Sequence, residues 1–272
     1  MIDVMIILAI LVLAILFLIQ PGRVRPGQLA PFSGWNYAHR GLFSKDQSVP
    51  ENSLPAFEAA VAAGYGMELD VQLSKDGYVV VFHDDTLPRA TGVEGRVDAY
   101  TLEELQNMPL FGTQHTMPLF SDVLAVIGGK TPLIVELKSG PRNAELCRKT
   151  LELLRGYEGA YCVESFDPTV VAWFRKNAPD VLRGQLADDY ASYRPNSSPV
   201  LAFALSNCLG NCIARPQFIA WGPGKKPVLV RLAEAFGPMK VFWTAHDTMD
   251  VASLEAEFDG VIFEHYTPTP RY

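Results

Sequence analysis

The chain contains 272 residues, of which 49% are hydrophobic and 19% are charged, a composition too apolar for a disordered protein. Its 21 glycines and 20 prolines are too few for a fibrous repeat, and its length suits one large domain or two small ones. The net charge of −7 supplies no basic surface of the kind that binds nucleic acid, so we expect no nucleic-acid partner.

The chain opens with a strongly apolar run, Val4–Ile19, whose sixteen residues include no polar side chain. At about 1.5 Å per residue a helix of this length covers roughly 24 Å of a hydrocarbon core about 30 Å thick. The run therefore predicts a short transmembrane anchor over residues 1–20. A cleaved signal peptide is the alternative, but no basic residue precedes the run, and Gln20-Pro21-Gly22 is not a small-x-small cleavage site.

Two arginines, Arg23 and Arg25, follow the predicted anchor, and no basic residue precedes it. The positive-inside tendency then places the rest of the chain in the cytoplasm. Residues 21–34 are rich in proline and glycine and predict a linker. We expect a single folded domain from residue 35 to residue 272.

Strand-like runs alternate with helical stretches throughout this domain. This alternation predicts an α/β protein with a parallel sheet, and eight strands predict a closed TIM-type (β/α)8 barrel. The expected core strands are Asn36–Ala38, Met67–Leu73, Leu133–Leu137, Tyr161–Val163, Val181–Gln185, Phe218–Trp221, Lys240–Trp243 and Gly260–Phe263. The expected helices are Leu54–Ala63, Asn143–Leu154, Pro168–Asn177, Val228–Phe236 and Asp250–Phe258.

Two features qualify this expectation. A doubly wound sheet is the alternative fold, but it favours a glycine-rich first turn, and His39-Arg40-Gly41 holds one glycine. An additional strand, Tyr78–Phe82, follows a turn at Lys75-Asp76-Gly77. Residues 84–131 then interrupt the alternation and contain one short helical pattern at Leu102–Met108, so we expect an insertion on one rim of the barrel.

The four cysteines, Cys147, Cys162, Cys208 and Cys212, form no C-x-x-C motif. This spacing gives no support to a zinc ribbon or a thioredoxin-type site. We expect packing thiols and a reducing compartment.

Polar residues fall where the predicted strands end, which is where barrel enzymes place their chemistry. Glu68 and Asp70 lie two residues apart on a strand and so share one face. Two carboxylates at that distance are costly unless a cation neutralises them. The complete set at the predicted barrel mouth is His39, Arg40, Glu68, Asp70, His83, Asp84, Glu136 and Lys138.

The residue types in this set indicate a reaction class. Oxygen ligands favour one divalent cation, Ca²⁺ or Mg²⁺, over zinc. Two histidines beside that cation suit an acid–base pair, and Arg40 with Lys138 suits a phosphate group. The sequence contains no Walker loop, so a phosphodiester is a better expectation than a nucleotide γ-phosphate.

An ordered series of motifs from about residue 35 to residue 265 resembles the glycerophosphodiester phosphodiesterase family. Each motif is weak alone, whereas the ordered set is specific. The matching stretches are His39-Arg40-Gly41, Pro50-Glu51-Asn52-Ser53, Glu68-Leu69-Asp70-Val71, Lys75-Asp76-Gly77, His83-Asp84, Glu136-Leu137-Lys138, Ser165-Phe166-Asp167-Pro168, Trp243-Thr244 and Asp259-Gly260.

The resemblance implies a TIM-type barrel with a small insertion after its second unit. It implies that Glu68, Asp70 and Glu136 bind the metal ion and that the histidines His39 and His83 are the acid–base pair. In the mechanism that follows, one histidine deprotonates a glycerol hydroxyl, which attacks phosphorus, and the other protonates the leaving alcohol. Water then opens the resulting cyclic phosphate. His83 is counted as a metal ligand in some members of the family.

Further residues take expected roles beside this set. Arg40 and Lys138 are expected to bind the phosphate, and Trp243, at a strand end, to form a wall against the substrate. Glu51 is either a metal ligand or a partner that orients Arg40, and the second role is favoured.

Other positions depart from the family pattern or lie outside it. His246 and Glu264 differ from the residues usual in the family, and we expect both near the organic part of the substrate. His265 is either a substrate contact or a surface residue, as is His246. His115 falls in the insertion and is expected to be exposed.

Three functions remain open at this point. The first is metal-dependent hydrolysis of a glycerophosphodiester or, in a phospholipase D-like reaction, of a lysophospholipid at the membrane. The second is a sibling phospholipase on the same barrel that releases a cyclic phosphate. The third is a membrane-tethered binding module without turnover.

Overall fold

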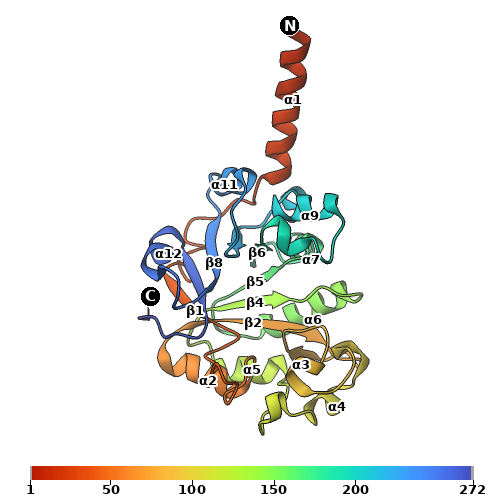
Figure 1. The fold of residues 1–272 in the computed structure, drawn as a ribbon, viewed down its shortest axis with the longest axis vertical. Coiled ribbons are helices and arrows are strands. Elements are labelled where there is room, and N and C mark those ends of the chain that lie inside the picture. The colour runs from red at the N-terminus through yellow and green to blue at the C-terminus, as the bar shows by residue number, and fades with distance from the viewer. Residues whose placement is uncertain (1, 271–272) are drawn as a thin grey trace.

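The computed structural model describes residues 2–270, and its centre is a closed barrel of eight parallel strands (Figure 1). The barrel closes because β1 pairs in parallel with both β2 and β9. The predicted TIM-type barrel is therefore confirmed. Around the barrel the order is β1 (Trp35–His39), β9 (Gly260–Phe263), β8 (Met239–Ala245), β7 (Phe218–Trp221), β6 (Leu182–Ala187), β5 (Tyr161–Ser165), β4 (Leu133–Leu137) and β2 (Gly66–Leu73).

Outside the barrel, β3 (Val79–Val81) runs antiparallel to β2. Helices follow the strands and cover the outside of the barrel. They are α2 (Leu54–Ala63), α3 (Pro88–Thr91), α4 (Leu102–Gln106), α5 (Phe120–Ile127), α6 (Asn143–Arg155), α7 (Pro168–Asn177), α8 (Tyr190–Tyr193), α9 (Pro199–Ser206), α10 (Asn211–Ala214), α11 (Val228–Glu234) and α12 (Val251–Glu257), with 3-10 turns at Val97–Ala99 and Leu110–Gly112.

The structure differs from the expected elements in two places. The expected insertion, residues 84–131, contains helix α5, which packs on the barrel as the outer helix between β2 and β4. The connection from β6 to β7 contains α8, α9 and α10, which the sequence analysis left unassigned. Both regions contain short helices separated by glycine, proline or asparagine, so no sustained helical period marks them.

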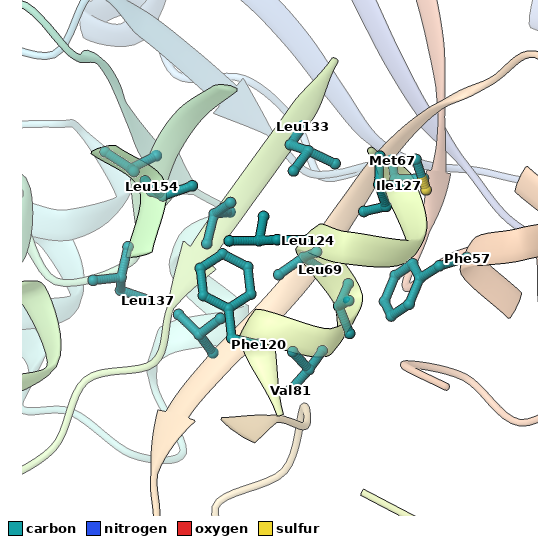
Figure 2. Packing of buried hydrophobic residues seen from close by; sticks show 14 of the residues in the cluster. Phe57, Met67, Leu69, Val81, Phe120, Leu124, Ile127, Leu133, Leu137 and Leu154 are labelled. Carbon is teal, nitrogen blue, oxygen red and sulfur yellow. The ribbon is translucent and has the colours of Figure 1, made fainter. Parts of the chain in front are cut away.

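The main hydrophobic core lies between the outer face of the sheet and its covering helices (Figure 2). Helix α5 has its apolar residues on one side, and Phe120, Leu124 and Ile127 point toward β2 and β4. Figure 2 shows Phe120 among Leu124, Leu137 and Val81. These contacts fix β2 and β4, the two strands that carry the carboxylates described below.

The inside of the barrel is apolar toward its amino-terminal end. Tyr37 of β1, Ile134 of β4 and Cys162 of β5 point inward and are buried. Gly184 leaves space for the inward ring of Phe218, because a Cβ at position 184 would lie 2.0 Å from Phe218 Cε2. On β4 and β5 the inward row changes from apolar to ionisable, from Ile134 to Glu136 and from Cys162 to Glu164, so charged groups collect at the carboxyl end.

Helix α1 (Ile2–Ile19) projects from the barrel (Figure 1) and is long and apolar enough to cross a membrane. A signal sequence has the same properties. The segment after α1 is hydrogen-bonded to the barrel domain. Gly22 N donates to Pro216 O at 2.8 Å, and Gln217 Nε2 donates to Arg23 O at 3.1 Å.

The four thiols differ in burial, which leads to a labelling prediction. Burial raises the pKa of Cys147 and of Cys208 to about 12 and raises the pKa of Cys162 well above its ordinary value. Cys212 is only half-buried. We expect maleimide to modify one cysteine in the folded protein near neutral pH and all four after denaturation, as read by intact mass. Modification of a second cysteine in the folded protein would contradict this assignment.

Candidate active site

The carboxyl ends of the strands surround a cavity of about 220 Å³. Ionisable and apolar side chains share its wall. The lining residues are His39, Arg40, Glu68, His83, Glu136, Glu164, Phe166, Leu186, Trp243 and Ile262. The remaining residues expected at the site, Asp70, Lys138 and Glu51, contact members of this wall.

Three buried carboxylates lie together at this end of the barrel. Glu68 and Asp70 alternate inward on β2, and Asp70 stands beside Glu136 of β4 in the parallel register. One carboxylate oxygen from each residue lies within 4.8 Å of the others. The strand register, rather than a loop, sets this spacing.

Lys138 compensates part of this charge. Its Nζ lies 2.8 Å from Asp70 Oδ1 and 2.9 Å from Glu136 Oε2. Burial alone raises the pKa of Asp70, but Lys138, His83 and Arg40 hold that pKa well below its ordinary value. Asp70 is therefore ionised. Burial lowers the pKa of Lys138, but the two carboxylates raise it more, so the ammonium is charged.

Nearby positive charge offsets less of the burial of Glu68 and Glu164. Burial and repulsion by Asp70 and Glu136 raise the pKa of Glu68 well above its ordinary value. Glu164 of β5 is also buried; burial and repulsion by Glu136 raise its pKa, and its Oε2 has no hydrogen-bond partner. Several oxygen donors around one point, with more negative charge than Lys138 balances, fit a hard divalent cation such as Ca²⁺ or Mg²⁺.

His39 ends β1 and is held by a carboxylate. Its Nδ1 lies 2.7 Å from Glu264 Oε2, and its Nε2 lies 3.8 Å from Glu68 Oε2. Burial lowers the pKa of His39, and the hydrogen bond with Glu264 opposes that shift. Burial alone raises the pKa of Glu264, but His39 lowers it to about 2. An ionised Glu264 therefore fixes the ring through Nδ1 and leaves Nε2 for chemistry.

His83 follows β3 and has an equivalent arrangement. Its Nδ1 lies 2.6 Å from Asp84 Oδ1. Arg89, from helix α3, donates Nε to Asp84 Oδ2 at 2.5 Å and Nη2 to Glu51 Oε1 at 2.6 Å. Glu51 in turn accepts from Arg40 Nη1 at 2.8 Å. A continuous chain of hydrogen bonds thus joins His83 to Arg40.

The turn after β1 places Arg40 at the site. Arg40 and Gly41 have φ of 56° and 79°, and a Cβ at Gly41 would lie 2.9 Å from Ala56 Cβ, so only glycine fits there. The turn directs Arg40 N–H toward Glu68 Oε2 at 3.2 Å. Asn52 Nδ2 donates to Asp70 Oδ2 at 2.8 Å, which accounts for an asparagine beside Glu51.

Aromatic side chains form the apolar part of the wall. The Trp243 ring stands edge-on to Phe166, with centroids 5.4 Å apart, and its Nε1 donates to Ala220 O at 3.2 Å. The indole is thus held in place with its ring exposed to the cavity.

Two contributors to the site, Glu164 and Arg89, were not predicted from the sequence, and a third, Glu264, was predicted in a different place. Glu164 was overlooked because the expected strand stopped at Val163; one further alternating position would have turned it inward. Arg89 gave no local signal. Glu264 was expected near the organic part of the substrate, whereas the structure places it directly on His39.

The remaining histidines lie outside the cavity wall. His246 and His265 are 3.6 and 3.5 Å from Glu264 Oε1, so they surround the residue that holds His39. His115 lies in the expected insertion and is half-buried rather than exposed, so that expectation is wrong.

Comparison with known proteins gives a consistent result. A sequence model of the glycerophosphoryl diester phosphodiesterase family matches residues 39–267. A glycerophosphodiester phosphodiesterase from Caldanaerobacter subterraneus is 37% identical over 161 residues; the match spans 55% of this chain and 65% of that relative, so less than two thirds of its length.

Two further proteins are similar over different extents. A lysophospholipase D from Rattus norvegicus is 32% identical over 140 residues, 47% of this chain and 43% of that protein. The structure of an Oleispira antarctica phosphodiesterase in complex with the product sn-glycerol-3-phosphate has a TM-score of 0.68 at 24% identity, and covers 85% of this chain and 93% of that one. The similarity to the Oleispira antarctica structure shows a shared fold.

Proposed function

The chain belongs to the glycerophosphoryl diester phosphodiesterase family, and from that premise we propose that it hydrolyses glycerophosphodiesters to an alcohol and glycerol phosphate. One observation carries the proposal. A single cavity joins an oxygen-ligand triad to two imidazoles, each with Nδ1 held by a carboxylate. The Oleispira antarctica protein, which shares the fold, is described in complex with sn-glycerol-3-phosphate.

Glu68, Asp70 and Glu136 would hold the divalent cation, Ca²⁺ or Mg²⁺. When bound, such an ion neutralises charge that develops on the phosphate oxygens. Lys138 and Arg40 keep neighbouring carboxylates ionised and present fixed positive charge to the same phosphate.

The two histidines would move the protons. His39 is the better base, because burial favours its neutral form and Glu264 leaves Nε2 unprotonated toward the cavity. His39 takes the proton of the glycerol hydroxyl as that oxygen attacks phosphorus. His83, paired with Asp84, gives a proton to the leaving alcohol oxygen. Water then opens the cyclic phosphate with the two roles reversed.

Trp243 and Phe166 supply the surface for the organic part of the substrate. A lysophospholipid is the second candidate substrate, favoured by the apolar helix α1 and by the name of the Rattus norvegicus relative. Both substrates share the phosphodiester and differ in the acyl chain.

Turnover on two substrates tests the function. The full chain in lipid nanodiscs is expected to release choline from glycerophosphocholine or lysophosphatidylcholine when Ca²⁺ or Mg²⁺ is present. After chelation of the cation, we expect no release of choline. Cation binding without turnover of either substrate would identify a binding module. Accumulation of a cyclic phosphate as the final product would identify the sibling phospholipase.

We also propose that α1 remains in the mature protein and anchors the barrel on the cytoplasmic side of a membrane, with Arg23 and Arg25 inside. Intact mass of the membrane-extracted protein tests the first part, because cleavage after residue 20 would remove the helix. Protease access in sealed vesicles tests the second.

Glu264→Gln is expected to lower kcat by about 10- to 100-fold with a smaller change in KM. The neutral amide orients the His39 ring less firmly and does not stabilise the imidazolium that forms when His39 takes a proton. Steady-state kinetics measure both constants. Glu257→Gln, the same change at an exposed position on α12, is the matched control and should behave as the unaltered protein. Equal rates for the two variants would refute the role given to Glu264.

A further inference from the structure

The last turn of α1 is built into the barrel domain. Ile19 is fully buried and packs with Trp221, Val230 and other residues around β7 and α11. Asn211 Nδ2 of α10 donates to Ile19 O at 2.8 Å, and Arg215 Nη1 donates to Gln20 O at 2.7 Å. The last turn of α1 is therefore fixed between α10 and α11 and does not depend on a flexible linker for its position. We call this contact region, formed by Ile19 and Gln20 with α10, α11 and Arg215, the seat of α1.

This seat shortens the part of α1 that is free to enter a bilayer. Residues Ile2–Ile15 project beyond it and, as a helix, measure about 21 Å. The hydrocarbon core is about 30 Å thick. For α1 to span even a thinned bilayer, the hydrocarbon must reach the domain surface around the base of the helix.

The surface at that end of the domain is apolar. In Figure 1, α9 and α11 lie at the end from which α1 rises. Val200 is 80% exposed and Val228 is 72% exposed, although both are hydrophobic. We call the exposed apolar residues of these helices the collar: Val200, Leu201 and Phe203 of α9, Ile213 of α10, Val228 and Leu232 of α11, and Phe236 just after it.

The charge pattern distinguishes this region from the rest of the chain. Residues 190–217, which include α9 and α10, contain two arginines and no acidic residue, in a chain with a net charge of −7. Arg215 also lies over the Phe17 ring at 4.7 Å, at the junction of helix and domain. Within residues 190–217 an apolar surface with arginines and no carboxylates complements lipid headgroups and the acyl region beneath them. On α11, Glu234 is paired with Lys226 at 2.7 Å.

From the short free length of α1, its fixed seat and the composition around it, we propose that the collar is a lipid-binding surface that lies in the interface of the same bilayer. This inference rests on the proposed anchor. The barrel domain then sits partly in the membrane interface on α9, α10 and α11.

Depth measurements on the full chain in phosphatidylcholine–phosphatidylglycerol nanodiscs test the proposal. In a Cys212→Ser background, the single replacements Phe203→Cys and Val228→Cys carry an environment-sensitive fluorophore on the collar. Val12→Cys reports on α1, and Gln106→Cys, exposed on α4 at the opposite end in Figure 1, is the matched control. Collar probes are expected to shift to shorter wavelength and to lose intensity with lipids spin-labelled near the headgroup, whereas the control probe does neither.

Three other results of the probe measurements would each contradict a specific part of the proposal. If the Val12 probe is quenched by spin-labelled lipid while the collar probes behave as the control, the collar proposal is wrong and the anchor stands. If the Val12 probe is also in water, the anchor itself is refuted. If collar probes are shielded from aqueous iodide but not quenched by spin-labelled lipid, a second protein copy covers the collar and the lipid proposal is overturned.

Discussion

Replacing either His39 or His83 with alanine is expected to lower kcat by about 10²- to 10⁴-fold, the usual contribution of a positioned acid or base. Each imidazole has Nδ1 committed to a carboxylate and lines the cavity. Removing one ring leaves proton transfer to water while the oxygen ligands remain in place. Cation affinity should therefore change much less than kcat, which separates this effect from loss of the metal site.

The histidine variants have an internal control in His115→Ala, which removes the same side chain from the expected insertion and should leave kcat unchanged. Steady-state rates and calorimetric Ca²⁺ or Mg²⁺ titrations on all three variants provide the comparison. Near-normal turnover of His39→Ala or His83→Ala with the cation bound would show that the acid–base assignment is wrong.

Asp70→Asn is expected to abolish tight binding of the divalent cation and to lower kcat by more than about 10²-fold, since even neighbours of metal ligands contribute 10- to 100-fold. The change is nearly isosteric but removes the charge that pairs with Lys138 and lies 3.7 Å from Arg40 Nε. Chelation of the unaltered protein should produce the same loss, and added Ca²⁺ or Mg²⁺ should reverse it.

Asp122→Asn, at an exposed position on α5, is the matched control for Asp70→Asn. Glu136→Gln is the second variant, and circular dichroism establishes that both site variants are folded. Retention of cation affinity in both Asp70→Asn and Glu136→Gln would rule out the triad as the metal site.

The barrel and the carboxylate pair could be predicted from the sequence because both depend on local patterns. Polar and apolar residues alternate along 67–73, so Glu68 and Asp70 had to share a face. The parallel register then brings Glu136 beside Asp70, as expected from consecutive barrel units. Tertiary structure added little to these assignments.

The partners of the histidines could not be predicted in the same way. His39 and Glu264 are 225 residues apart, and they meet only because barrel closure places β1 beside β9. Arg89 reaches Glu51 from a four-residue helix that has no periodic signal. Such contacts depend on the position of each loop on the barrel rim, which the linear pattern does not contain.

The hydrogen-bonded chain from His83 through Asp84, Arg89 and Glu51 to Arg40 gives helix α3 a specific importance. The guanidinium of Arg89, which lies outside the eight strand–helix repeats, connects the turn after β1 to the residues that follow β3. A change in this helix, which lies outside the eight barrel strands, should therefore lower turnover before it lowers the melting temperature. We therefore expect the segment between the second and third repeats to contribute to catalysis through Arg89.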